Sequence, residues 1–201
     1  MELINLLTLI ISILVIVGFI GTIYKMFEKS KPSVEYIVLL AVLIALSVVA
    51  NFIGSISHVQ IAFFIAIMAG VVFGKESGFL VGSLSILVFG LISGFGVGTY
   101  TPYQMIGFGL LGFTASIFKN NMESLPFRAI FGLLWGFIYG WITNISMFYF
   151  TPITVSSVIS TYMASVAFDA IRGVCTLILL VIAYTWFKDI FNRSKKKYNI
   201  Q

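Results

Sequence analysis

The uncharged stretch at residues 94–104, G-F-G-V-G-T-Y-T-P-Y-Q, offers a dense set of groups that could hold a small molecule. Its three glycines leave the backbone free to bend, and Pro102 fixes one turn. Tyr100 and Tyr103 present flat aromatic surfaces, and Gln104 adds an amide. This chemistry suits a lid over a small polar or aromatic ligand. A tight, rigid turn between two helices is the alternative.

A few polar side chains interrupt the apolar runs elsewhere in the chain. Asp169 and Arg172 are three residues apart, so on a helix they share a face and can pair. They either contact a ligand or pair with each other and staple the helix. Asn144 needs a partner on another helix or on a ligand, because an unpaired buried amide is costly. His58 and Gln60 precede another apolar run, although a lone histidine in a loop is more often simply solvated.

The motifs that would indicate catalysis or metal binding are missing from the sequence. It has no His-Glu-x-x-His, no Gly-x-Ser-x-Gly and no cluster of carboxylates, and Cys175 is its only cysteine. Residues 70–77, G-V-V-F-G-K-E-S, differ from a phosphate-binding loop in glycine spacing and in having Glu76 after the lysine. We therefore expect no enzyme activity, no metal and no cofactor, and any ATP-driven step would need a partner protein.

The elements that must position these groups are membrane helices. The chain is 60% hydrophobic and only 9% charged, whereas soluble domains have about 25% charged residues. The sequence predicts an all-α integral membrane protein that contacts lipid, not nucleic acid. The N-terminal run lacks a preceding basic region, so we expect a retained helix instead of a cleaved signal peptide. Seven helices are predicted, at residues 4–24, 34–52, 59–73, 78–92, 103–118, 129–150 and 162–187.

The positions of the basic residues predict the orientation of these helices. Every Lys and Arg except Arg172 lies after the first, third, fifth or seventh predicted helix. The junctions at residues 51–58, 94–104 and 151–160 have none. Because basic junctions face the cytoplasm, we expect a multi-pass plasma-membrane protein with a cytoplasmic C-terminus and an extracellular N-terminus. The junctions without basic residues would then lie outside.

Three parts of the chain follow from this pattern. Residues 1–33 form an extra transmembrane helix with a basic junction, residues 34–188 a six-helix membrane domain, and residues 189–201 a basic cytoplasmic tail. Small residues at four-residue spacing mark faces where helices can approach closely. For Ala41 and Ala45 this face could lie inside the bundle or against a partner, whereas Gly132, Gly136 and Gly140 favour packing inside the bundle.

A six-helix core with Ala41-x-x-x-Ala45 in its first helix resembles the substrate-binding S-components of energy-coupling factor (ECF) transporters. Residues 100–105, Y-T-P-Y-Q-M, are similar to the Trp-Thr-Pro-x-Gln-Met loop of one branch of that family. Asn144 and Asp169 fall where the branch has similar residues. The resemblance covers about residues 34–187, and the loop is its most specific part.

The resemblance implies a six-helix S-component-like bundle plus one extra N-terminal helix. It implies capture of a vitamin or related micronutrient, with a cobalamin-like ligand as the best guess. The family's alanines contact a coupling transmembrane subunit, which implies that role for Ala41 and Ala45, and two cytoplasmic ATPases supply the energy. The residues expected at the ligand are Tyr100, Tyr103, Gln104, Asn144, Asp169, Arg172, Gln60 and His58.

Two departures from the branch pattern concern the ligand. Arg172 stands where a histidine is expected and Thr176 where an asparagine is expected. The arginine puts the particular cargo in doubt and could favour an anionic group. A small multi-helix scaffold protein without ligand, resembling the MreD family, is the alternative function. A small intramembrane enzyme is disfavoured because the sequence lacks converging catalytic groups.

Overall fold

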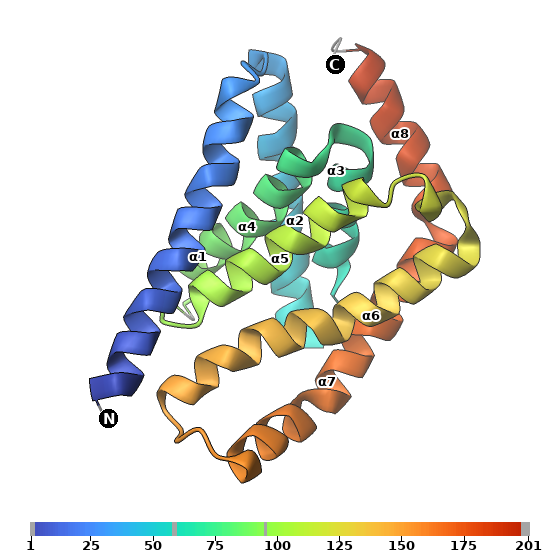
Figure 1. The fold of residues 1–201 in the computed structure, drawn as a ribbon. Coiled ribbons are helices and arrows are strands. Elements are labelled where there is room, and N and C mark those ends of the chain that lie inside the picture. Colours follow the sequence, from blue (N-terminus) through green and yellow to red (C-terminus); the bar gives the residue numbers. More distant parts are fainter. Residues whose placement is uncertain (1–2, 58–59, 95, 198–201) are drawn as a thin grey trace.

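The structure, a computed structural model, describes residues 3–57, 60–94 and 96–197. All regular elements within these residues are helices, as predicted (Figure 1). The α-helices are α1 (Leu3–Lys29), α2 (Val34–Ser57), α3 (Ile61–Phe73), α4 (Lys75–Ile92), α5 (Thr101–Ile117), α6 (Leu125–Asn144), α7 (Val155–Ile182) and α8 (Tyr184–Lys197). Two short 3-10 helices, η1 (Asn121–Glu123) and η2 (Ile145–Tyr149), lie on either side of α6.

The helices are built to lie in a membrane. Among the described residues, α1, α2, α4, α6 and α7 are long and apolar enough to cross a bilayer, while α3 is a shorter apolar helix. The basic residues of the junctions, Lys29, Lys75, Lys119 and Arg128, lie where α1, α4, α5 and α6 end or begin on one side of the bundle. We call this side the basic end. The loops at residues 93–94, 96–100 and 150–154 lie at the opposite side, here called the uncharged end.

Helix α3 forms the centre of the bundle. Eleven of its thirteen residues are buried, and α4 and α5 pack closely against it. The close approach depends on glycines, because a Cβ atom at Gly70 or Gly78 would overlap the backbone of Gly112 on α5. Close van der Waals packing of this kind holds membrane helices together, because apolar lipid tails leave no hydrophobic driving force between helices. Gly70 and Gly78 therefore serve packing within the bundle.

Helices α6 and α7 form an antiparallel hairpin beside this centre (Figure 1). A Cβ at Gly136 would overlap Gly173 of α7, and a Cβ at Gly132 would crowd the backbone of Leu177. A Cβ at Gly140 would overlap the carboxylate of Asp169. The prediction that these α6 glycines pack inside the bundle is confirmed.

Helix α2 continues beyond its predicted end. It runs to Ser57, so the predicted turn at residues 51–58 is wrong for residues 51–57, and His58 lies outside the described residues. Asn51 is only 6% exposed, and its polarity does not end a helix that packs against α3 and α4. The sequence predicted that the helix ends near Asn51, but packing against α3 and α4 continues the helix to Ser57.

Helix α7 also begins earlier than predicted, at Val155 instead of Tyr162. The hydroxyl of Thr154 accepts a hydrogen bond from the Ser157 backbone N–H at 3.1 Å, and the Ser157 hydroxyl accepts one from the Thr154 backbone N–H at 2.9 Å. This reciprocal capping starts the helix in a serine- and threonine-rich segment that composition alone suggests to be a loop.

The C-terminal segment continues as a helix where we expected a tail. Helix α8 follows α7 after Ala183 and reaches Lys197, so residues 189–197 of the expected tail are helical. Phe187 and Phe191 pack against Phe64 and Phe73 of α3, with ring centroids 5.1 and 5.7 Å apart. The apolar side of α8 therefore extends the core.

Candidate functional site

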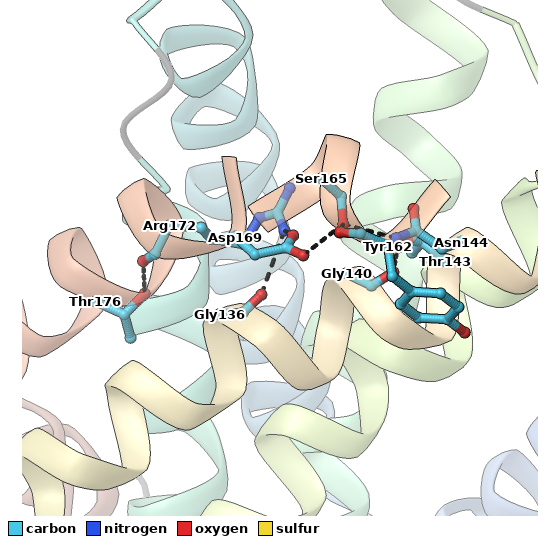
Figure 2. A network of polar contacts seen from close by, with 9 residues as sticks. All are labelled: Gly136, Gly140, Thr143, Asn144, Tyr162, Ser165, Asp169, Arg172 and Thr176. Atoms are coloured by element: carbon cyan, nitrogen blue, oxygen red, sulfur yellow. Dashed lines mark hydrogen bonds and ion pairs between the residues drawn. The ribbon is translucent and has the colours of Figure 1, made fainter. Parts of the chain in front are cut away.

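A chain of polar side chains joins α6 to α7 inside the apolar bundle (Figure 2). Asn144 donates a hydrogen bond to the Ser165 hydroxyl at 2.8 Å, and Ser165 donates one to Asp169 Oδ2 at 2.9 Å. Arg172 Nη1 lies 2.8 Å from Asp169 Oδ1 and 3.4 Å from the Gly136 carbonyl oxygen. The predicted pairing of Asp169 and Arg172 is present, and Asn144 bonds to the neighbouring helix through Ser165.

Burial makes the acid–base pair interdependent. Asp169 is 2% exposed and the Arg172 side chain 17% exposed. A single charge in such a place is costly, whereas a hydrogen-bonded pair compensates most of that cost. Neither charge can therefore be removed without leaving the other uncompensated.

Aromatic rings complete the surroundings of Arg172. Its guanidinium carbon lies 4.9 Å from the ring centre of Tyr139 and 5.9 Å from that of Phe63. These rings attract a cation through their electron-rich faces. The guanidinium thus points from α7 toward α6 and α3, and its buried Nε atom has no hydrogen-bond partner among the described residues. The arrangement leaves Arg172 with unused donor capacity inside the bundle.

The glycine–aromatic loop lies at the uncharged end. Gly94 and Gly96 both have φ near +77°, a left-handed conformation that favours glycine, which confirms the backbone freedom expected there. Two hydrogen bonds within the loop hold its shape. The Tyr100 hydroxyl donates one to the Gly96 carbonyl oxygen at 3.1 Å, and Thr101 Oγ1 accepts one from the Gly98 N–H at 2.9 Å.

A cavity of about 230 Å³ opens between this loop, α4 and α5. Its polar wall comes from Tyr100, Thr101 and Gln104, and its apolar wall from the end of α4 and from Gly96. The volume is below the 300 Å³ or more that is typical for drug-sized ligands. The cavity can therefore hold a small molecule or one group of a larger one.

Of the other predicted ligand residues that the structure describes, none lines this cavity. Tyr103 is 3% exposed and packs toward α1, where its hydroxyl lies 2.7 Å from that of Ser12. Gln60 is the N-cap residue of α3, is partly exposed, and its side chain makes no capping hydrogen bond. The structure therefore separates a cavity lined by Tyr100 and Gln104 from a polar chain that contains Asn144, Asp169 and Arg172.

Ala41 and Ala45 lie on the outer face of α2. Both are exposed, as are their neighbours Val38 and Val42, which are 56% and 50% exposed. Their spacing therefore serves no packing within the described chain. This face is available for lipid or for another protein.

Ser165 and Tyr139 belong to the site although the sequence analysis did not select them. Ser165 is four residues before Asp169, a spacing that places both on one helix face. That pattern could have identified the serine. Nothing in the sequence indicates Tyr139, because its contact with Arg172 depends on how α6 and α7 cross.

The described residues contain no group of three or more His, Cys, Asp or Glu side chains that could hold a metal ion. The groups present are hydrogen-bond donors and acceptors, one compensated ion pair and aromatic rings.

Comparison with known proteins gives one result of consequence. The sequence model of the family described as ECF transporter, substrate-specific component, matches residues 35–192. No curated protein and no solved structure gives a significant match.

Proposed function

The chain belongs to the family of substrate-specific components of ECF transporters, and on this premise we propose that it captures a vitamin or related micronutrient. Membership makes it the substrate-specific subunit of a transporter whose other parts are membrane and ATPase subunits. The family binds substrate for transport and is not a family of enzymes. The match removes the reason to prefer a scaffold protein without ligand.

We propose that capture takes place at the uncharged end, outside the cell. The positive-inside bias supports this orientation, because the junctions at the basic end contain the lysines and the loops at the opposite end contain none. The C-terminus is then cytoplasmic and the N-terminus extracellular. The coupling subunit docks on the Ala41 and Ala45 face, and two cytoplasmic ATPases drive release.

The observation that supports the site best is the connected chain of polar side chains that joins α6 to α7 in an otherwise apolar bundle, formed by Asn144, Ser165, Asp169 and Arg172. In the proposed complex, Gln104 and Tyr100 hold one group of the ligand at the described cavity. Asn144, Asp169 and Arg172 offer a second polar surface, and Tyr103, which directly precedes Gln104, is the further aromatic residue proposed at the ligand. Gln60, at the start of α3, is a further proposed ligand contact, as is His58, which lies outside the described residues.

The ligand we propose is a vitamin with both aromatic and polar parts, with a cobalamin-like molecule as the first candidate. The resemblance of residues 100–105 to the corresponding loop of that branch supports it. A molecule of that size exceeds the cavity of about 230 Å³, so the loop would move to admit it. Asp169 already compensates the charge of Arg172, so an anionic ligand group would have to displace that carboxylate.

Binding to the purified protein tests the proposal directly. The full chain in detergent is titrated with cobalamin, riboflavin, folate, biotin and thiamine, and co-purified small molecules are identified by mass spectrometry. We expect one ligand to bind at micromolar or lower Kd. Gln104→Ala should weaken it about tenfold, the loss of about 1.4 kcal/mol expected for one good hydrogen bond.

Thr22→Ala is the matched control, because Thr22 is exposed on α1 and its hydroxyl bonds only to its own helix at Gly18. It should leave the Kd unchanged. Absence of any binder at micromolar concentration, together with no co-purified molecule, would contradict capture of a vitamin. If an identified ligand binds Gln104→Ala and Asn144→Ala with the Kd of the parent protein, the site lies elsewhere.

A further inference from the structure

Helix α1 lies outside the family match, which begins at residue 35, yet it packs on the domain along a narrow face. Ile16, Ile20 and Ile23 are buried on this face, where Phe79 and Tyr103 contact them. The opposite face is open, as Leu14 at 65% exposure illustrates. Such one-sided packing is that of an added helix at the edge of a bundle.

Two polar contacts stand out on the packed face of α1. The hydroxyl of Tyr24 lies 3.0 Å from that of Ser83 on α4. Toward the uncharged end, the Ser12 hydroxyl lies 2.7 Å from the hydroxyls of both Tyr103 and Tyr149. A serine hydroxyl has one proton to donate and two lone pairs, so it can bond to both tyrosines at once.

The two tyrosines belong to different parts of the fold. Tyr103 is in the first turn of α5, directly after the glycine–aromatic loop, while Tyr149 ends η2, which follows α6. Their rings contact each other only obliquely, with centroids 5.8 Å apart at 49°. Ser12 therefore joins the start of α5 to the far end of the α6–α7 hairpin.

We propose that Ser12 is a positioning residue and that α1 is a clamp, which fixes the spacing between α5 and η2 at the uncharged end. Where this concerns the ligand it rests on the proposed function, because both elements lie at the uncharged end, where we propose that capture takes place. The clamp itself follows from the contacts. In apolar surroundings a hydroxyl without a partner is unfavourable, so the three hydroxyls hold the elements together.

The contact between Tyr24 and Ser83 also supports the proposal that α1 is a clamp. Tyr24 and Ser83 join α1 to α4 toward the basic end, so α1 is attached at two levels. With one attachment on α4 and the other on α5 and η2, α1 links these three elements. A change at Ser12 should release the start of α5 and η2 without detaching α1.

A distance measurement without any ligand tests the clamp. Cysteines replace Val97 and Phe150, both well exposed, in the full chain with Cys175→Ser, and nitroxide labels are attached. Double electron–electron resonance in lipid nanodiscs then gives the distribution of distances between the loop and the end of η2. We expect a narrow distribution for the parent protein and a longer or broader one for Ser12→Ala.

Thr22→Ala removes from the same helix a hydroxyl that donates its hydrogen bond to Gly18 of α1 itself, so it should leave the distribution narrow. Tyr149→Phe breaks the same bridge from its other side, keeps α1 intact, and should reproduce the broadening. It also replaces Ser12→Ala as the decisive variant if the serine change prevents folding.

A distribution that is unchanged in both Ser12→Ala and Tyr149→Phe, even with a lowered melting temperature, would overturn the proposal, because the bridge would then add stability without setting the spacing. The measurement needs no ligand, so it can succeed or fail independently of vitamin capture.

Discussion

The carboxylate of Asp169 on α7 occupies the space beside Gly140 on α6, so a Cβ atom at residue 140 would overlap both carboxylate oxygens. This relationship explains why a charged side chain and a glycine face each other inside a membrane bundle. The absent side chain lets Asp169 reach Ser165 on one side and Arg172 on the other. The close approach of α6 and α7 at Gly140 therefore determines both the packing of the hairpin and the position of Asp169 in the polar chain.

Gly140→Ala should destabilise the protein by about 1–3 kcal/mol, the range for overpacking a tight interface. The methyl group must push the Asp169 carboxylate away from Arg172. Thermal unfolding in detergent measures the loss. Gly18→Ala on α1 is the control, because a Cβ there meets nothing within 4 Å. Equal stability of the two variants would show that Asp169 moves without cost.

Asp169→Asn should cost about 3 kcal/mol or more, because it leaves the Arg172 charge buried without its partner. Adding Arg172→Met should recover part of this loss, so the double variant should be more stable than Asp169→Asn alone. Glu76→Gln is the comparison, since Glu76 forms a partly exposed ion pair with Lys75 at 3.9 Å. Such pairs contribute about 1 kcal/mol or less. Additive effects at Asp169 and Arg172 would contradict the coupling.

Replacing Ala41 or Ala45 by tryptophan should abolish uptake in cells that express the whole transporter while leaving ligand binding intact. Both alanines are exposed, so the larger side chain disturbs a partner contact and not the bundle. Leu14→Trp, on the open face of α1, should leave both uptake and binding unchanged. Co-purification of the ATPase subunits provides a second readout. Normal uptake by both alanine variants would place the coupling interface elsewhere.

Tyr184 should ionise only above the pH at which ordinary tyrosines ionise. Burial, and secondly the Glu123 carboxylate, raise the pKa of its hydroxyl, which donates to Glu123 at 3.2 Å. The neutral form is favoured in the folded protein, so its stabilising effect is complete below about pH 10 and is lost as pH rises through the higher folded pKa. Ultraviolet titration of the protein and of Tyr184→Phe should differ only above pH 10. A difference at lower pH would contradict the burial.

Much of the fold could be predicted because hydrophobic length and charge placement act locally. Apolar runs separated by basic or glycine-rich junctions indicated membrane helices, and the match to residues 35–192 confirms the family that the Ala41 and Tyr100–Gln104 patterns suggested. Helix ends were less predictable. Asn51 looks like a turn residue but lies buried in α2, while Thr154 and Ser157 look like loop residues but cap α7.

For the candidate site, residue types and spacing determined which groups could act. Asp169 and Arg172 could pair at a spacing of three, and Gly94 and Gly96 could supply a bend; both features are present in the structure. The partners of these groups depended on how distant helices cross. Only the tertiary structure placed Asp169 against Gly140, Arg172 over Tyr139 and Ser12 between two tyrosines. The sequence by itself determined membrane helices and an inventory of polar groups, because these follow from local composition, whereas contacts between helices depend on packing that no local pattern encodes.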